Sequence, residues 1–196
     1  MNTNVIYDFE TLSQCQRTGA VLCLAILAFD EERFTTNPYE FSELVNSAKT
    51  IRFNIEDQVK RYNRAIQKST LDWWAEQSAE AQTLLRPTEY DKPLEDIDDF
   101  IRNAVNVEDI KRVYTRGNTF DPMFMQYIYE DIGLSEPFPW YTVRDTRSTI
   151  DGLAWGTDIS TKFFPEGLED KFVAHNPAHD IAMDVMRIQT LVQIIN

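Results

Sequence analysis

The stretch Val5–Phe29, VIYDFETLSQCQRTGAVLCLAILAF, contains two apolar segments that decide the type of fold. Val5–Asp8 is a short apolar run that ends in an acid, and it predicts a strand. Ala20–Phe29 is rich in Val, Ile, Leu and Ala and has few polar residues, which is typical of a buried central strand. We therefore expect a sheet that begins near the N-terminus.

The rest of the chain adds further strands and then helices. Tyr39–Val45 (YEFSELV) partly alternates apolar and polar residues, so a third, half-exposed strand and an antiparallel meander are expected. Two more strands are predicted at Lys111–Thr115 and Trp140–Asp145. Helices are predicted from Ser69 to the residues before Pro87, and at Pro93–Val105, Phe120–Asp131, Thr146–Leu153 and Ala178–Ile195.

This order of elements predicts an α/β domain with a mixed sheet. The chain has 196 residues, which fits one domain with a substantial core. We expect residues 1–196 to form that single domain, with a helical insertion at about residues 54–106.

Charge and cysteine content exclude several classes of function. The net charge of −13 argues against a protein that binds nucleic acid along a broad groove, because such proteins usually present a basic face. It is compatible with an enzyme that binds only the end of a nucleic acid strand. Cys15 and Cys23 match no metal or redox motif, so two free thiols are expected. We find neither a long apolar run nor a signal peptide, and expect a cytoplasmic protein without membrane contact.

Asp8 and Glu10 are the first candidates for a chemical role. They lie two residues apart at the end of the first predicted strand, and residues i and i+2 of a strand point to the same face. Two such carboxylates repel each other, and the pair is tolerated if it is exposed or if it binds a hard cation. Alone, the pair is a weak signal, since acidic proteins contain several.

Two later segments add candidates. Asp121 follows a predicted strand and a glycine-containing loop, and the preference of acids for helix N-termini explains it when it is taken alone. The only two histidines of the chain lie in His175–Asp180 (HNPAHD). Because Pro177 favours the first turn of a helix, we expect His175 in the preceding loop and Asp180 in the helix. For this pair alone, a capping contact is the simpler explanation.

Together, these residues predict a nuclease site. Four carboxylates can hold two divalent ions about 4 Å apart, the arrangement that in-line displacement at a phosphodiester requires. We expect the metal ligands to be Asp8, Glu10, Asp121 and Asp180. His175 would take the proton from the attacking water as general base.

The three motifs, in this order, resemble the Exo I, Exo II and Exo III motifs of DEDDh exonucleases, the family of the DnaQ proofreading subunit, RNase T and oligoribonuclease. The matching segments are Tyr7–Thr11, Arg116–Asp121 and His175–Asp180. More narrowly, Lys68–Ser78 (KSTLDWWAEQS) and Phe172–His175 are similar to the tailed-phage exonuclease A (DexA) group. The resemblance covers most of the chain.

The resemblance implies a ribonuclease-H-like α/β fold, with a mixed five-stranded sheet flanked by helices, and a 3′→5′ exonuclease that depends on two Mg²⁺ or Mn²⁺ ions. By analogy with the phage group, the expected substrate is single-stranded DNA, released as 5′-mononucleotides; RNA is the alternative. By analogy with related dimeric enzymes, a homodimer is a further expectation, and if a phage encodes the protein, its expected location is the cytoplasm of the host. A nuclease-like domain that binds without cleaving is a second class of function, although the complete set of five residues argues against it.

The resemblance also suggests residues that contact the substrate. Thr11 and Leu12 follow the first motif, and Asn118 and Phe120 precede Asp121 in a loop. Core packing explains Leu12 and Phe120 equally well.

Aromatic and basic residues elsewhere are also candidates for substrate contacts. Trp73 and Trp74 are adjacent and would point about 100° apart on a helix, so at most one of them faces the core fully. The other is available to stack on a base. Three arginines are candidates for phosphate contacts, namely Arg17, Arg116 and Arg144.

The third motif has a second register, because His179 and Asp184 repeat the spacing of His175 and Asp180. We prefer the first pair, since Pro177 places His175 before the helix and His179 inside it. The family often has alanine where this chain has Pro177.

Overall fold

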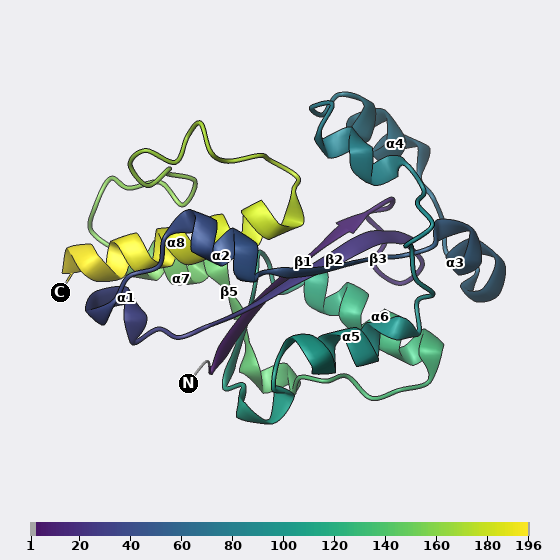
Figure 1. Ribbon diagram of the computed structural model, residues 1–196, viewed down its shortest axis with the longest axis horizontal. Coiled ribbons are helices and arrows are strands. Elements are labelled where there is room, and N and C mark those ends of the chain that lie inside the picture. Colours follow the sequence, from purple (N-terminus) through teal and green to yellow (C-terminus); the bar gives the residue numbers. More distant parts are fainter. Residues whose placement is uncertain (1–2, 196) are drawn as a thin grey trace.

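The computed structural model describes residues 3–195 and is built around a mixed sheet of five strands (Figure 1). In spatial order the strands are β3 (Lys49–Arg52), β2 (Val21–Phe29), β1 (Asn4–Thr11), β4 (Arg112–Thr115) and β5 (Val143–Asp145). β1 to β3 form an antiparallel meander, while β4 pairs parallel with β1 and β5 pairs parallel with β4. The carboxyl ends of β1, β4 and β5 therefore lie at one edge of the sheet.

The central strand β1 is buried along most of its length. Its side chains alternate between the two faces of the sheet. Val5, Tyr7 and Phe9 belong to the core cluster that contains residues of α5 and α6, whereas Ile6 belongs to the cluster that contains residues of α8. Asp8 shares the face of Ile6, so the acids of β1 point toward α8.

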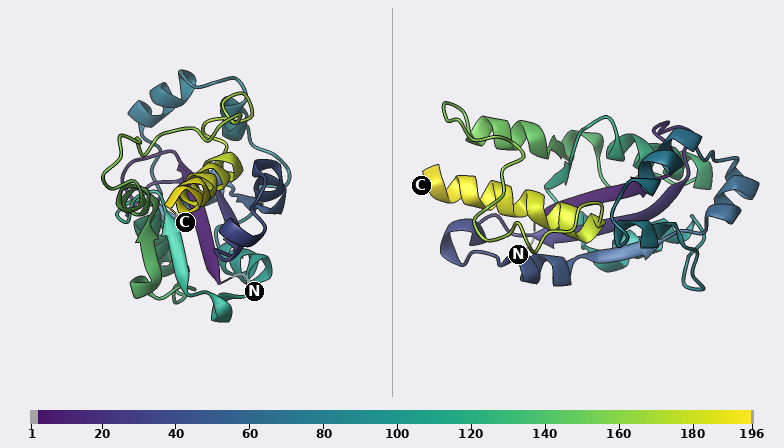
Figure 2. Two further views of the ribbon diagram at one scale, coloured as in Figure 1. Left: turned by 90° about the vertical axis from the view of Figure 1, so that its left-hand side faces the viewer. Right: turned by 90° about the horizontal axis from the view of Figure 1, so that it is seen from above.

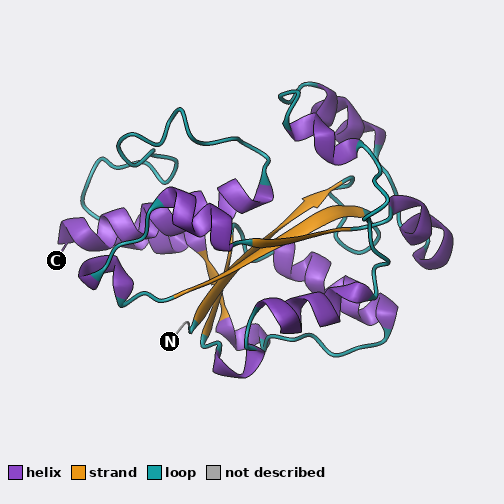
Figure 3. Cartoon of the chain, viewed as in Figure 1, coloured by secondary structure: helices purple, strands orange, loops and turns teal. Residues whose placement is uncertain are grey.

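Helices cover both faces of the sheet (Figures 2 and 3). One face carries α1 (Arg33–Thr36), α2 (Phe41–Ser47), α7 (Thr146–Leu153) and α8 (Pro177–Ile195). The other face carries α5 (Asp96–Ala104) and α6 (Asp121–Ile132). This layering confirms the predicted α/β architecture with a mixed five-stranded sheet between helices.

The predicted third strand at Tyr39–Val45 is wrong in position. α2 occupies most of that segment, and the third strand, β3, follows it. Phe41 and Leu44 are three residues apart and both buried in the cluster with α8 residues, which is the spacing of one helix face. The partial alternation of the segment came from a short amphipathic helix. The predicted strand at Trp140–Asp145 is also shorter, because only its last three residues form β5.

A largely helical segment connects β3 to β4. It contains α3 (Ile55–Tyr62), α4 (Lys68–Ala75), the 3₁₀ turn η1 (Ala81–Leu85), α5 and the 3₁₀ turn η2 (Val107–Asp109); a further 3₁₀ turn, η3 (Trp140–Thr142), precedes β5. α4 lies beside the carboxyl end of β1 (Figure 1). Trp74 is fully buried there with Leu12 and Leu22. Its indole Nε1 donates a hydrogen bond to the carbonyl oxygen of Thr11, at 3.0 Å.

The C-terminal helix begins where its sequence predicts. Pro177 is the first residue of α8, and the Asn176 side chain accepts hydrogen bonds from the backbone N–H groups of Ala178 and His179, at 3.2 and 3.3 Å. Within residues 3–195, no helix has both the length and the apolar character needed to cross a bilayer.

Candidate active site

The carboxyl edge of the sheet brings together acids from three elements. Asp8 and Glu10 come from β1, Asp121 is the first residue of α6, and Asp180 lies in the first turn of α8. The backbone N–H of Phe9 donates a hydrogen bond to Oδ1 of Asp121 at 3.1 Å, which fixes Asp121 beside the two acids of β1. The structure thus gathers all four acids that the sequence singled out as metal ligands.

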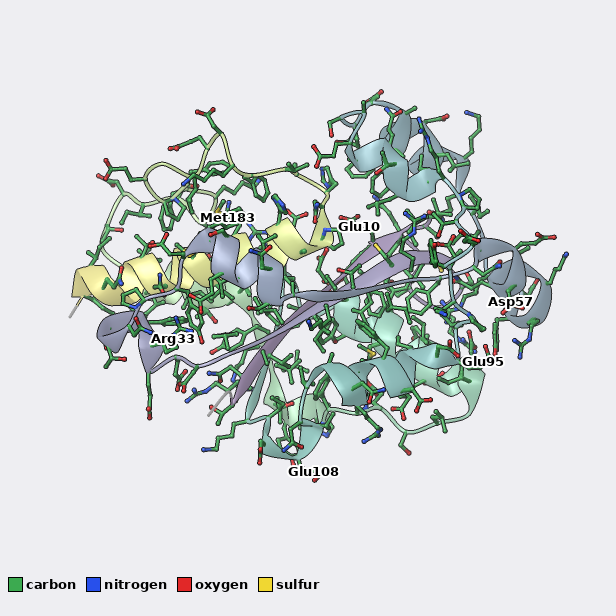
Figure 4. The ribbon with its side chains drawn as sticks, in the orientation of Figure 1. Glu10, Arg33, Asp57, Glu95, Glu108 and Met183 are labelled. Atoms are coloured by element: carbon green, nitrogen blue, oxygen red, sulfur yellow. The ribbon has the colours of Figure 1, made fainter. Side chains whose placement is uncertain are left out.

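His175 joins this cluster from the loop before α8. Glu10, His175 and Asp180 each offer one potential ligand atom, and these atoms lie within 4.8 Å of one another. Glu10 is seen where β1 approaches the N-terminal end of α8 (Figure 4). His175 has a left-handed backbone (φ 61°), which is uncommon for a residue other than glycine and turns the chain sharply into the helix.

The four acids repel one another in a partly dehydrated site. Burial raises the pKa of Asp8 well above its usual range, and the charges of Asp121 and Glu10 raise it further. Burial and the charge of Asp180 likewise raise the pKa of Glu10. Burial is the main cause that raises the pKa of Asp121 to about 7, and the pKa of Asp180 to about 7. Without a neutralising cation, each ionised carboxylate in the cluster disfavours the ionisation of the others.

The donor set fits a hard divalent cation. Within residues 3–195, none of these four carboxylates forms an ion pair with a lysine or arginine, although the chain has 19 such residues. Carboxylate oxygens are the protein ligands that Mg²⁺ and Mn²⁺ prefer. A bound cation would neutralise the repulsion that nearby arginines offset only in part.

Asp184 lies one turn after Asp180 on α8 but has a different environment. Its buried carboxylate is paired with the guanidinium of Arg116 and with Nη1 of Arg187 at 2.9 Å, and it accepts a hydrogen bond from the Thr146 hydroxyl at 2.6 Å. Because two arginines already neutralise it, Asp184 is poorly suited to bind a metal ion.

His179 also lies apart from the cluster. Its Nδ1 accepts a hydrogen bond from the backbone N–H of Val173 at 3.1 Å, and its ring packs edge-on against Phe41, with centroids 5.4 Å apart. The geometry therefore favours His175 with Asp180 over the second register, His179 with Asp184.

The residues expected to contact substrate have mixed environments. Leu12 is only 4% exposed and packs beside Trp74, so its side chain belongs to the core, as one of the two interpretations held. Thr11 is 8% exposed and its hydroxyl donates to the carbonyl oxygen of Ser13. Phe120 is partly buried against Phe124, with ring centroids 5.1 Å apart, while Asn118 is exposed.

The three arginines expected near phosphates all have partners within the protein. Arg17 pairs with Asp131 at 2.9 Å and lies over the ring of Tyr127. Arg116 pairs with Asp184. Nη1 of Arg144 donates to the carbonyl oxygens of residues 141 and 143, both at 2.8 Å.

Arg147 is a basic residue near the site that the sequence did not reveal. It is exposed, lies in the first turn of α7, and forms no ion pair with any residue in the described part of the chain. Its charge partly offsets the effect of burial and lowers the pKa of Asp121. A Cβ added to Gly117 would lie 3.2 Å from Nη1 of Arg147, and Gly117 has φ 116°, so only glycine fits this turn readily.

Comparisons with known proteins show the family to which the chain belongs. The sequence model of the 3′-5′ exoribonuclease Rv2179c-like domain matches residues 3–189. An exodeoxyribonuclease of Enterobacteria phage T4 is 33% identical over 202 residues, which cover 94% of this chain and 86% of the phage protein.

Solved structures of exonuclease I have a similar fold. The zinc-bound complex of E. coli exonuclease I with single-stranded DNA has a TM-score of 0.59 and 14% identity, and a product-bound exonuclease I has a TM-score of 0.57 and 13% identity. All of this chain is covered, but it spans only 40% and 43% of the length of those two chains.

The fold is therefore ribonuclease-H-like, the architecture of DnaQ-like nucleases. The chain belongs to the family of the Rv2179c-like 3′-5′ exoribonuclease domain, and it is a 3′-5′ exonuclease with a phage relative. The enzymatic interpretation of the sequence is confirmed over the binding-domain alternative.

Removal and addition of metal should change stability in a pH-dependent way. Because the pKa values of Asp121 and Asp180 are raised from 3.8 to about 7, the folded protein holds more protons than the unfolded chain between these values. In the metal-free protein, these two groups therefore contribute favourably to the free energy of unfolding below about pH 4. This contribution is lost as the pH rises through about 7. Added Mn²⁺ should therefore stabilise the protein more at pH 8 than at pH 6.

Thermal unfolding in EDTA and in Mn²⁺ at both pH values measures this effect. A Mn²⁺ concentration 100 times the Kd corresponds to about 2.7 kcal/mol of stabilisation. Asp8→Asn should reduce the gain, whereas Asp151→Asn, at an exposed position of α7, should leave it unchanged. Equal gains at both pH values and in both variants would contradict the assignment of the cluster as the metal site.

The two histidines provide a direct test of the register. His175→Ala should lower kcat by about 10²–10⁴-fold, the usual contribution of a general base. His179→Ala should retain most of the activity of a folded protein, because its ring contacts Phe41 rather than the acids. The measurement compares the hydrolysis rates of the two variants on a nucleic acid strand, and circular dichroism confirms that both are folded. Loss of activity in His179→Ala alone would show that His179 and Asp184 form the active pair.

Proposed function

We propose that this enzyme shortens single-stranded DNA from its 3′ end and releases 5′-mononucleotides. The observation that carries the proposal is the convergence of Asp8, Glu10, Asp121, Asp180 and His175 at one edge of the sheet, with the potential ligand atoms of Glu10, His175 and Asp180 within 4.8 Å of one another. The phage T4 relative, named as an exodeoxyribonuclease, supports DNA as the substrate, as do the exonuclease I complexes with single-stranded DNA.

Each of the five residues has a role in the proposed reaction. Asp8, Glu10, Asp121 and Asp180 would hold two Mg²⁺ or Mn²⁺ ions. When bound, these ions would lower the pKa of the attacking water and neutralise the negative charge on the leaving 3′-oxygen. Burial lowers the pKa of His175 below its usual value, so the imidazole is neutral at neutral pH and can accept a proton.

The reaction is an in-line displacement at the last phosphodiester. The imidazole of His175 accepts a proton from water while the water oxygen bonds to phosphorus. The bond between phosphorus and the 3′-oxygen of the preceding nucleotide breaks, and this oxygen takes up a proton from solvent, to which His175 later returns the proton that it accepted. The products are a 5′-mononucleotide and a strand that is one nucleotide shorter, and no covalent enzyme intermediate forms.

The charge distribution supports a site that holds only a strand end. With a net charge of −13, the protein has little long-range attraction for a polyanion. Arg147, beside Gly117 and near Asp121, is positioned to meet a phosphate close to the reacting one. Thr11, Asn118 and Phe120 are the proposed contacts to the terminal nucleotide.

Several broader predictions from the sequence belong to this proposal. We propose one exonuclease domain with the helical insertion at about residues 54–106, acting in the cytoplasm, that of the host if a phage encodes it. RNA is the second candidate substrate, because the family model that matches is named for an exoribonuclease. The homodimer predicted by analogy remains a prediction.

A time course on 5′-labelled single-stranded DNA and RNA of one sequence tests the proposal. We expect a ladder that shortens from the 3′ end, faster on DNA, in Mg²⁺ but not in EDTA. Asp8→Ala should abolish the ladder and the exposed Asp151→Ala should not. If RNA is shortened faster than DNA, RNA is the preferred substrate and the proposal of DNA is wrong. If neither polymer is shortened, the proposed function is contradicted.

Arg147→Ala should weaken substrate binding without removing the chemistry. We expect KM to rise about 3- to 10-fold, equivalent to about 0.7–1.4 kcal/mol, with kcat little changed. The salt dependence of kcat/KM should also become shallower, because one phosphate contact is lost. Arg144→Ala is the matched control, since its guanidinium is hydrogen-bonded to backbone carbonyls. Equal kinetics for the two variants would argue against the contact.

A further inference from the structure

The helical segment between β3 and β4 places two tryptophans against His175. The ring of Trp73 lies 4.7 Å from the His175 ring, centroid to centroid, at an interplanar angle of 80°. The ring of Trp74 lies 6.2 Å from it at 73°, and the two indoles are 5.3 Å apart at 77°. Three aromatic rings thus form one edge-to-face cluster at the active site.

α4 is fixed relative to the acids of β1. The indole Nε1 of the fully buried Trp74 donates to the carbonyl oxygen of Thr11, the residue after Glu10, at 3.0 Å. The backbone N–H of Gln67, just before α4, donates to the carbonyl oxygen of Leu12 at 2.9 Å. These two bonds tie the helix to the strand end that carries Glu10, so Trp73 has a defined position relative to the acids.

His175, by contrast, has few restraints of its own. It lies at the end of a segment without helix or strand, residues 154–176, and its backbone is in the left-handed region. Within residues 3–195, no hydrogen bond from another group fixes the orientation of its imidazole. The Trp73 ring is the nearest of the two indoles packed against that imidazole.

We propose that Trp73 is a positioning residue that holds the imidazole of His175 toward Glu10 and Asp180. This inference rests on the proposed role of His175 as general base. Trp73 is 41% exposed, although tryptophan usually buries its ring, and the same ring packs between the buried Trp74 and the imidazole of His175. In this proposal, the helical segment between β3 and β4 completes the catalytic site by packing against an imidazole that forms no hydrogen bond within residues 3–195.

A positioning role and a base-stacking role differ in their kinetics. A misplaced general base slows the chemical step, by up to about 10²-fold for a shift of about 1 Å. Loss of a stacking surface weakens substrate binding instead. We expect Trp73→Ala to lower kcat about 10- to 100-fold with KM within about 2-fold of wild type, and Trp73→Phe to restore most of kcat. Leu71→Ala, at a 40% exposed position of the same helix, is the matched control and should change neither constant.

A double-mutant cycle with His175→Ala isolates the interaction. If Trp73 acts only through His175, Trp73→Ala should change kcat by less than about 2-fold in the His175→Ala background. A full additional loss in that background, or a rise in KM with unchanged kcat in the single variant, would overturn the proposal in favour of a direct substrate contact. Wild-type kinetics in Trp73→Ala would overturn it altogether.

The contact itself is measurable without turnover. The imidazole resonances of the two histidines can be assigned by NMR with His179→Ala, and those of His175 should move when the Trp73 ring current is removed, but not in Leu71→Ala. Unmoved His175 resonances would refute the contact. If His175→Ala keeps full activity while the His175 resonances do shift in Trp73→Ala, the proposed general base is refuted but the contact is not. The failure of the proposed function can thus be distinguished from the failure of this inference.

Discussion

The repulsion among four carboxylates at the end of β1 is the constraint on which the site depends. Asp8, Glu10, Asp121 and Asp180 come from three elements and meet in a partly dehydrated site. Burial raises the pKa of each, and the charges of other acids in the cluster raise the pKa values of Asp8 and Glu10 further. A fold that brings acids together in this way loses stability unless a cation is bound. Asp184, one helical turn away, shows the alternative, because two arginines neutralise it within the protein. Within residues 3–195, the four acids of the cluster lack such ion pairs, so a metal ion would act where the protein supplies the least neutralisation.

The rest of the molecule holds this cluster in place. Burial on both faces makes β1 a rigid central strand, and α6 and α8 bring Asp121 and Asp180 to its end. The α4 helix is hydrogen-bonded to the same strand end through Trp74 and reaches His175 through Trp73. The acidic surface of the protein is consistent with this design, since hydrolysis at a strand end needs local neutralisation of one phosphate rather than a long basic groove.

Much of the site could be predicted because it depends on local periodicity. The two-residue period of a strand places Asp8 and Glu10 on one face, and Pro177 fixes where α8 begins. Tyr39–Val45 was misjudged because a short amphipathic helix and a half-exposed strand give similar patterns, and only packing against α8 decides between them. Arg147 and the contact between Trp73 and His175 depend on which elements become neighbours in space. No local pattern in a single sequence contains that information.

Anomalous diffraction from crystals grown with Mn²⁺ tests most directly whether the four acids bind a metal ion. We expect manganese peaks within the cluster, bonded to carboxylate oxygens of Glu10 and Asp180 and shared with Asp8 or Asp121, and no peak at Asp184. Peaks confined to exposed surface acids, with the cluster empty in crystals that contain Mn²⁺, would contradict the central claim that these buried acids are gathered to bind a metal ion.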